Sequence, residues 1–461
     1  MKKNSAVTGT LILAAAGFTT RLMGFVYRIL ISRLIGSEGM GLFGLISPIY
    51  FFTFTLCGSG TYTAISKMVA EARSEREATK LVLPGLIVTV LISLTAMFSL
   101  QMLAEPIGIH LLGDGRTVPA LRLISLALPF CAAGSCFKAY FLGVRKMMIP
   151  ALDQVLEQVV RMGAIWLFAA SISKDDLQAA CMIAVFGNVV GDLFSCLFAA
   201  AAYFIICLKN KKGAYRLGDS TWGRMFSLSI PLTVNRSIGS ALSGFENIII
   251  PKVLVRSGMS SAAALSAYGE FNGMAFPIIL FPTLFTNALS TNLLPIVSSA
   301  KSSHENRKLQ TAIEQSLRLT LYMGFFCGAA FLLWGEWLGT LLYGSSSAGG
   351  YISLLAFVCP FFYLQSVLGG LMNGLDLQND SLVHTVVCDG IRIMILLFIV
   401  PKYGFGAFIA SLVLTNILLA LLNLRTLLKV TPVRIRLRRL ITPPSPASVV
   451  KLLPTYTRKR R

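Results

Sequence analysis

Charged side chains interrupt several long apolar runs of this chain, and arginine is prominent among them. The stretch AAGFTTRLMGFVYRILISRLIG carries Arg21, Arg28 and Arg33 among apolar residues. Arg21 and Arg28 are seven residues apart, so a helix places them two turns apart on one face. Planar guanidinium groups bind phosphate through paired hydrogen bonds. The first two arginines therefore predict contact with an anionic, phosphate-bearing molecule, whereas Arg33 predicts an interfacial anchor.

A second set of charges stands at helical spacing in another apolar run. Asp153, Glu157 and Arg161 are four residues apart, which puts them on one stripe of a helix. Glu157 and Arg161 have the favourable order for an ion pair between residues i and i+4. We interpret this stripe as structural pairing, and proton or cation coupling is the alternative.

Other charged residues extend the candidates for coupling or pairing. Asp389 and Arg392 are also interpreted as a structural pair, with proton or cation coupling as the alternative. Asp192 is a candidate for the same roles and has no predicted partner. Glu270 is a carboxylate that could bind a cation. A charge at mid-membrane costs at least about 2.5–3.5 kcal/mol, so each of these residues needs a partner or a wet cavity.

The elements that must position these residues are membrane-spanning helices. The chain has 461 residues, of which 55% are hydrophobic and 13% charged, and its mean hydropathy is +0.72. A water-soluble chain of this length could not bury so much apolar surface. Apolar runs of roughly 20–30 residues recur, each long enough to cross a hydrocarbon core. The chain is predicted to be an all-α integral membrane protein.

About twelve transmembrane helices are predicted, and both termini are predicted to be cytoplasmic. We expect the helices at 6–34, 40–70, 81–104, 121–143, 150–172, 178–208, 223–250, 262–299, 312–342, 350–374, 381–400 and 404–428. The eighth contains Pro277, Pro282 and Pro295, which predict a break or bend. With the N-terminus inside, the inner connections hold the larger share of Lys and Arg. This topology accounts for the net charge of +21, and nucleic-acid binding is not needed to explain it.

Two similar halves are indicated by a weak internal repeat. Arg21-x-x-Gly24 in the first helix aligns with Arg236-x-x-Gly239 in the seventh. Two parallel six-helix repeats are a known transporter plan. The predicted parts are an N-terminal six-helix lobe at 1–208, a cytoplasmic linker at 209–222, a C-terminal six-helix lobe at 223–430 and a basic cytoplasmic tail at 431–461.

The repeat suggests where the arginines would meet. If the two halves surround a central cleft, Arg21, Arg28 and Arg236 line it and bind an anionic substrate. The alternative is that each arginine belongs to an internal salt bridge, for example with Glu246 or Glu270.

No residue pattern for enzyme chemistry or metal binding is found in the sequence. It has no Walker A loop, no Ser-His-Asp arrangement and no C-x-x-C pair, and its nine cysteines lie almost entirely in apolar runs. We therefore predict neither an enzyme nor a bound metal or cofactor. Transport would draw on Na⁺, H⁺, the membrane potential or the chemistry of the substrate.

Two longer stretches resemble a known family. They are GFTTRLMGFVYRILISRLIGSEGMGLFGLISPIYFF and FENIIIPKVLVRSGMSSAAALSAYGEFNGMAFPIILFPTLFTNALSTNLLPIVSSA, and they resemble the stage V sporulation protein B family. That family belongs to the polysaccharide-exporter branch of the MATE-like flippases, the MOP superfamily. The resemblance implies two six-helix lobes around a central cavity in a bacterial plasma membrane. It also implies export of undecaprenyl-diphosphate-linked sugars by alternating access in cell-wall, spore-cortex or capsule assembly.

The lipid II flippases are more distant relatives by the same resemblance. Arg21 matches the first arginine of their first-helix motif, whereas Tyr27 occupies the second arginine position and Arg28 the aspartate position. Asn272 stands where those flippases have an arginine in the eighth helix. The chain thus lacks one cationic anchor, and its substrate is predicted only as a lipid-linked anionic glycan.

Three functions are weighed from the sequence. The first is a flippase for such a glycan, with membrane lipids and cell-wall or polysaccharide synthases as further partners and with no nucleic acid. The second is a cation-coupled multidrug exporter, which would have an acid-rich, aromatic cavity in the N-terminal half. The third is a membrane scaffold for synthases that transports nothing. The basic tail either contacts anionic inner-leaflet lipids or has no specific role.

Overall fold

Two compact units make up the chain in a computed structural model. The first comprises residues 1–252 with 265–269, and the second comprises 253–264 with 270–461. The structure describes residues 2–169, 176–209, 219–303 and 305–431. Every element in these ranges is helical. Most of the predicted linker and all but one residue of the predicted basic tail lie outside the described residues.

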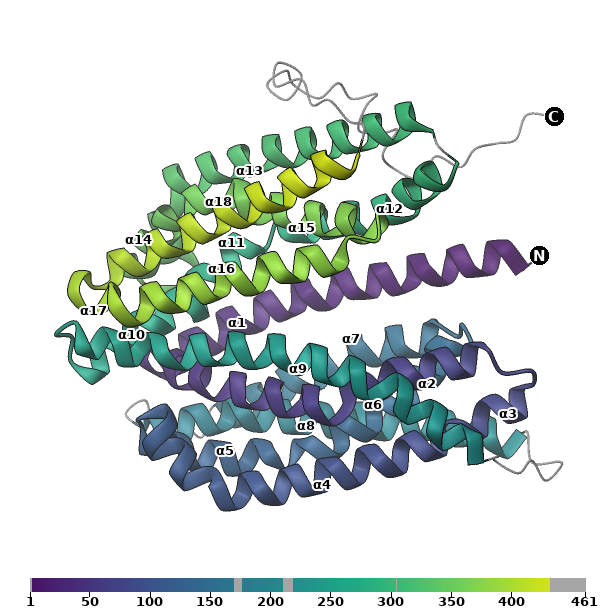
Figure 1. Cartoon of the computed structure of the whole chain (residues 1–461). Helices are drawn as coiled ribbons and strands as arrows, with labels where there is room; N and C mark the ends of the chain where they lie inside the picture. The colour runs from purple at the N-terminus through teal and green to yellow at the C-terminus, as the bar shows by residue number, and fades with distance from the viewer. Residues whose placement is uncertain (1, 170–175, 210–218, 304, 432–461) are drawn as a thin grey trace. The chain divides into compact units, whose positions relative to one another are not determined.

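The first unit is a helical bundle (Figure 1). Its α-helices are α1 (Lys2–Phe54), α2 (Gly60–Ala70), α3 (Glu75–Lys80), α4 (Val82–Pro106), α5 (Val118–Ser125), α6 (Ala127–Gly143), α7 (Met148–Ala169), α8 (Leu177–Lys209) and most of α9 (Asp219–Arg256). Three short helices join them, at Thr55–Ser59, Ile107–Leu112 and Gly115–Thr117. Helix α8 packs on α5, α6, α7 and α1, so it borders much of the unit's interior.

A glycine divides α1 into two helical stretches. Gly36 has φ 69° and ψ −173°, a backbone conformation that favours glycine, inside an otherwise helical run. The break separates the predicted helices 6–34 and 40–70. Just beyond it, a Cβ atom on Gly269 would lie 1.9 Å from the carbonyl oxygen of Ser37. Glycine therefore permits both the change of direction in α1 and the close packing of residues 265–269 against it.

The second unit contains the remaining helices. They are α10 (Ser261–Tyr268), whose last residues belong to the first unit, a π-helix (Gly269–Ala275), α11 (Phe276–Leu280), α12 (Thr283–Ser302), α13 (Asn306–Tyr343), α14 (Ser346–Leu355), a short 3₁₀-helix (Ala356–Val358), α15 (Cys359–Gly374), α16 (Gln378–Phe398), α17 (Val400–Tyr403) and α18 (Phe405–Val430). Helix α15 packs on α12, α13 and α18. The core here is mostly aliphatic and includes Leu293, Ile313, Leu368 and Leu371.

The predicted break in the eighth helix is confirmed. The segments Ser261–Leu280 and Thr283–Ser302 meet at an angle of 52°. Pro282 lies at this junction; it lacks the N–H needed for a helical hydrogen bond and its ring crowds the preceding turn.

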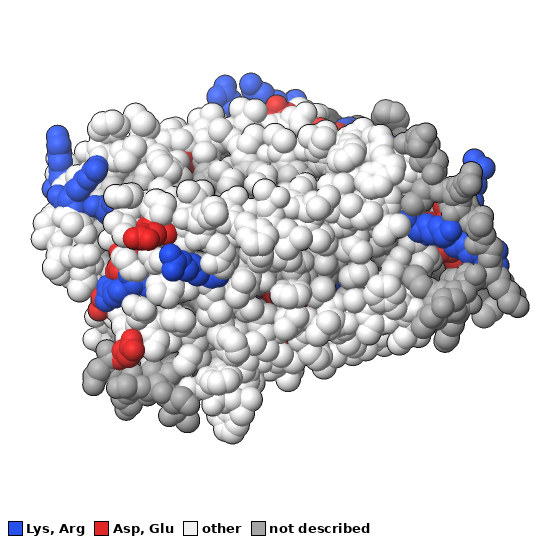
Figure 2. Space-filling view, turned by 90° about the horizontal axis from the view of Figure 1, so that it is seen from below, with Lys and Arg blue, Asp and Glu red and all other residues white. Residues whose placement is uncertain are grey.

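The membrane character of the chain follows from its helices. Among the described residues, nine helices are long and apolar enough to span a membrane, or ten if the bent pair forms one span. Helix α7, with its three charged residues, is not among them, and the two stretches of α1 are counted together with α2 as one. Twelve spans and cytoplasmic termini stay predictions. In the face drawn in Figure 2, the charged residues gather mostly toward the two ends and the broad centre is almost uncharged.

Contacts place most of α9 with the first unit rather than with the helices that follow it. The unit boundary falls between Lys252 and Val253. Arg236 of α9 donates a hydrogen bond to the carbonyl oxygen of Ser59, at 2.7 Å. A Cβ atom on Gly60 would lie 2.1 Å from the Thr233 hydroxyl oxygen, so α2 and α9 approach closely. The predicted lobes rest on the internal repeat and remain a prediction.

Candidate functional site

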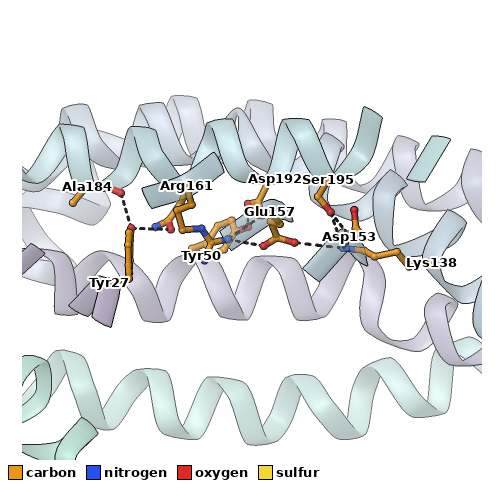
Figure 3. Close-up of polar contacts among 10 residues, drawn as sticks. Tyr27, Tyr50, Lys138, Asp153, Glu157, Arg161, Ala184, Asp192 and Ser195 are labelled. Carbon is orange, nitrogen blue, oxygen red and sulfur yellow. Dashed lines mark hydrogen bonds and ion pairs between the residues drawn. The ribbon is translucent and has the colours of Figure 1, made fainter. Parts of the chain in front are cut away.

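A network of charged and polar side chains connects four helices inside the first unit (Figure 3). Helix α7 contributes Asp153, Glu157 and Arg161 from one stripe, as their spacing predicts. Lys138 comes from α6, and Asp192 and Ser195 come from α8. Tyr27 and Tyr50 come from α1. The stripe of α7 turns toward these helices because α7 packs on both α8 and α1.

Arg161 stands at one end of this network. Its Nη2 atom lies 2.7 Å from Glu157 Oε1 and 3.6 Å from Asp192 Oδ1. The Tyr50 hydroxyl donates a hydrogen bond to Asp192 Oδ2. The predicted pair of Glu157 and Arg161 is confirmed. The interpretation of Asp192 as unpaired is wrong, because Arg161 and Tyr50 reach it from other helices.

Lys138 stands at the other end. Its Nζ atom lies 3.3 Å from Asp153 Oδ2 and 3.8 Å from Glu157 Oε2, and it donates to the Ser195 hydroxyl at 3.0 Å. Ser195 in turn donates to Asp153 Oδ2 at 2.9 Å. The Asp153 side chain is completely buried. Burying an isolated carboxylate costs much free energy, and the ion pair with Lys138 offsets this cost for Asp153.

A cavity of about 430 Å³ opens beside this network within the first unit. Polar and charged residues line it together with an aromatic wall. The polar lining includes Arg28, Ser47, Lys138, Glu157, Gln158, Arg161, Asn188 and Asp192, and the aromatic lining comprises Tyr27, Phe43, Tyr50, Phe51 and Phe54. A cavity of this size can hold a small polar group or several waters.

The formal charges around the cavity nearly balance. The network has three carboxylates, on Asp153, Glu157 and Asp192, and two cations, on Lys138 and Arg161, which leaves one negative charge in excess. Arg28 lines the same cavity and brings a further positive charge. The site therefore presents both signs of charge to whatever enters it.

The structure brings only some of the predicted arginines to this cavity. Arg28 lines it, whereas Arg21 is an exposed residue of α1 and is not part of its lining. Arg236 bonds to the Ser59 carbonyl oxygen, as described above. Asn272 lies in the π-helix of the bent segment, in the second unit. A common substrate cleft for these residues stays a prediction.

The remaining predicted carboxylates lie elsewhere. Glu246 is on α9. Glu270 accepts a hydrogen bond from the Ser345 hydroxyl at 3.0 Å. Arg392 Nη2 lies 2.8 Å from Asp389 Oδ1, one turn away on α16, so the prediction of a local pair is confirmed.

Sequence reasoning missed Lys138, Tyr50 and Ser195. Lys138 has no acidic residue three or four positions away, so helical spacing does not predict its pairing. A lysine inside the apolar run 121–143 was a usable signal, because an ionisable residue at membrane depth needs a partner. Tyr27 was noted only as a departure from a motif; its hydroxyl lies 3.4 Å from the Ala184 carbonyl oxygen and 3.3 Å from Asn188 Oδ1.

Family models match most of the chain. The model described as "Polysaccharide biosynthesis protein" matches residues 6–301, and the model described as "MatE" matches residues 250–398. Stage V sporulation protein B of Bacillus subtilis (strain 168) is 31% identical over 452 residues, which are 95% of this chain and 86% of that protein. Lipid II flippase MurJ of the same organism is 23% identical over 428 residues, which are 84% of this chain and 76% of that protein.

Solved structures share the fold at low sequence identity. A structure of lipid II flippase MurJ in an inward closed conformation has a TM-score of 0.71 and 16% identity, covering 96% of this chain and 91% of that chain. An inward-facing multidrug resistance MATE family transporter of the MOP superfamily has a TM-score of 0.64 and 15% identity, covering 89% of this chain and 95% of that chain.

Proposed function

The chain belongs to the polysaccharide biosynthesis protein family of the MOP superfamily, and from this premise we propose that it moves a lipid-linked anionic glycan across the membrane. The substrate class we propose is an undecaprenyl-diphosphate-linked sugar, carried from the inner to the outer leaflet by alternating access. The observation that carries the proposal is the charged cavity inside the first unit of a membrane protein. Ionisable residues at membrane depth are costly and usually mark a transport pathway.

Relatives support the substrate class without fixing the sugar. One relative is named as a sporulation protein and another as a lipid II flippase. This chain has Tyr27 and Asn272 where the second has arginines by the motif comparison above, so we propose a diphosphate-linked glycan and not lipid II in particular. Cell-wall, spore-cortex and capsule assembly are the proposed settings, and synthases are proposed partners. We propose a transporter rather than an enzyme.

The arginines would bind the diphosphate of such a substrate. Arg28 lines the cavity of the first unit, and its guanidinium can form paired hydrogen bonds with phosphate oxygens. Arg21 stands on the same helix face two turns earlier and would contact the substrate outside this cavity. Losing either cation should weaken binding of the anionic headgroup.

The charge network would supply coupling to an ion gradient. Its three carboxylates exceed its two cations by one charge. Arg28 in the same cavity offsets this charge, and when Arg28 binds the substrate diphosphate, one proton or one monovalent cation such as Na⁺ would replace it in that role and alter the contacts between α6, α7 and α8. We propose this network as the place where an ion gradient or the membrane potential acts on the transport cycle.

The test is depletion of the protein in its host, followed by mass spectrometry of lipid-linked intermediates. Accumulation of a polyprenyl-diphosphate glycan is expected. Wild-type protein supplied in trans should clear the intermediate, and Arg28→Ala should clear it at least tenfold more slowly although it inserts normally. Arg256→Ala, a change of an exposed arginine at the end of α9, is the matched control. No lipid-linked intermediate accumulating on depletion would refute the proposal.

A second candidate is a cation-coupled multidrug exporter. The cavity favours it in one respect, because Glu157 and Asp192 lie beside Tyr27, Tyr50 and the phenylalanines of the lining. Acidic and aromatic groups together suit an organic cation. Efflux of a cationic dye from cells that express the chain, lost in Glu157→Gln, would support this function. Unchanged dye accumulation together with accumulated glycan lipid on depletion would exclude it.

The scaffold hypothesis predicts a different result from the same variants. A protein that only recruits synthases would tolerate removal of the cavity charges. Full activity of Arg28→Ala and Glu157→Gln in the clearance experiment would therefore favour the scaffold over both transport functions.

A further inference from the structure

A second cavity, of about 240 Å³, lies between α1 and α7 on the first unit. Its lining is mostly apolar and comprises Tyr27, Leu30, Ile31, Arg33, Leu34, Met162, Ile165 and Trp166. We call this cavity the α1–α7 groove. Leu30 is 51% exposed and Trp166 is 79% exposed, so the groove opens to the surroundings of the bundle. Arg33 is the single charged residue of its lining and is also exposed.

The groove contains two residue types that are typical of a membrane interface. Arg33 precedes by three residues the break of α1 at Gly36, and Trp166 of α7 lines the same groove. Tryptophan is enriched where the hydrocarbon core meets the headgroups, and arginine extends its charge to the same level. The apolar part of the groove then faces acyl chains, and Arg33 faces lipid phosphates.

A wall separates the groove from the polar cavity. Tyr27 and Ile31 line both spaces and are 6% and 1% exposed. The Tyr27 hydroxyl bonds to α8, which fixes its ring between the two spaces. A molecule with its headgroup in the polar cavity cannot place its chain in the groove while this wall is closed. A second molecule can therefore occupy the groove independently of the polar cavity.

We infer that the α1–α7 groove binds one acyl chain of an anionic phospholipid from the bilayer, with the lipid phosphate on Arg33. Charge complementarity selects the anionic headgroup, because one near-surface arginine favours a lipid with net negative charge by about fivefold over a neutral one. The chain fills the apolar space against Met162 and Ile165. A lipid bound there would hold α1 against α7 and keep the wall at Tyr27 and Ile31 closed.

The test uses Trp166 as a reporter. The chain has four tryptophans, and changing Trp222, Trp334 and Trp337 to phenylalanine leaves Trp166 alone in the full-length protein. This protein is reconstituted in phosphatidylcholine vesicles in which phosphatidylglycerol or phosphatidylcholine with brominated chains is titrated over the same range of mole fractions. Brominated phosphatidylglycerol is expected to quench Trp166 at about fivefold lower mole fraction than brominated phosphatidylcholine.

Substitutions at Arg33 decide the result. Arg33→Gln should abolish the preference for phosphatidylglycerol, Arg33→Lys should retain most of it, and Arg256→Gln should leave it unchanged. Equal quenching by both lipids in the single-tryptophan protein, or an unchanged preference in Arg33→Gln, would overturn the inference. Absence of quenching by either lipid would also overturn it, since another protein surface would then cover the groove. Circular dichroism and gel filtration confirm that each variant is folded.

Discussion

The two units hold their polar residues in different ways. In the first unit, Lys138, Asp153, Glu157, Arg161 and Asp192 form one network across three helices. In the described part of the second unit, polar contacts such as the following three join residues in twos. Arg392 pairs with Asp389, His384 Nδ1 lies 2.8 Å from Asn423 Oδ1, and Gln365 Nε2 lies 2.6 Å from Asn416 Oδ1.

The polar contacts of the first unit depend on one another, whereas those of the second unit act as separate pairs. A hydrogen-bonded pair between two transmembrane helices adds a modest, local stabilisation. A network of three carboxylates and two cations cannot lose a cation without leaving a buried carboxylate uncompensated. We therefore expect substitutions in the first unit to be costly and coupled to one another, and those in the second unit to be mild and independent.

The largest effect is expected for Lys138→Met. The change leaves the completely buried Asp153 without its cation, and breaking a buried pair costs about 3–5 kcal/mol. Unfolding in mixed micelles, followed by circular dichroism, measures the loss of free energy. The double variant Lys138→Met with Asp153→Asn should recover part of it. If Lys138→Met alone were as stable as wild type, the expected difference between the two units would be wrong.

A smaller effect is expected for Tyr50→Phe. Its hydroxyl donates to the buried carboxylate of Asp192, and losing a hydrogen bond to a charged group costs about 1.5–3 kcal/mol. Tyr27→Phe is the matched control, because the hydrogen bonds of the Tyr27 hydroxyl go to a backbone carbonyl and an amide oxygen, at 3.4 and 3.3 Å. The same unfolding measurement compares them, and equal losses in the two variants would contradict a special role for the Asp192 contact.

A still smaller coupling is expected between His384 and Asn423 in the second unit. Hydrogen bonds between transmembrane helices average about 0.6 kcal/mol in double-mutant cycles. The cycle of His384→Ala and Asn423→Ala, read from unfolding free energies, should give a value near this average. A coupling above about 2 kcal/mol, the top of the range for such pairs, would show that the second unit also depends on a strong polar contact.

The smallest coupling is expected between Asp389 and Arg392. Both residues lie on one turn of α16, and local pairs of this kind contribute about 0.2–0.5 kcal/mol. A cycle of Asp389→Asn and Arg392→Met measures it. Combining Arg392→Met with Lys138→Met should give additive losses, since residues without shared partners act independently. A clear departure from additivity would link the two units energetically.

Local spacing predicted the pairs that lie on a single helix. Glu157 with Arg161 and Asp389 with Arg392 are four and three residues apart, and both pairs are present. The bend at Pro282 was predictable for the same reason, because proline acts on the turn that contains it. Each of these features depends on neighbours within one helical turn.

Contacts between helices were not predictable in this way. The partners Lys138 and Ser195 are 57 residues apart, and Tyr50 and Asp192 are 142 residues apart. Helical periodicity predicts which residues share a face of one helix. It does not predict which other helix packs against that face. The error at Asp192 follows directly, since its partners come from α1 and α7.

By itself the sequence determined that this chain is a helical membrane protein of a recognisable family, because apolar length and local charge spacing act within single helices. The tertiary structure decided which charges share a cavity and which residues separate that cavity from the α1–α7 groove. It also assigned most of α9 to the first unit. The physical reason is that a buried charge in an apolar bundle must find a partner wherever the packing of whole helices places one.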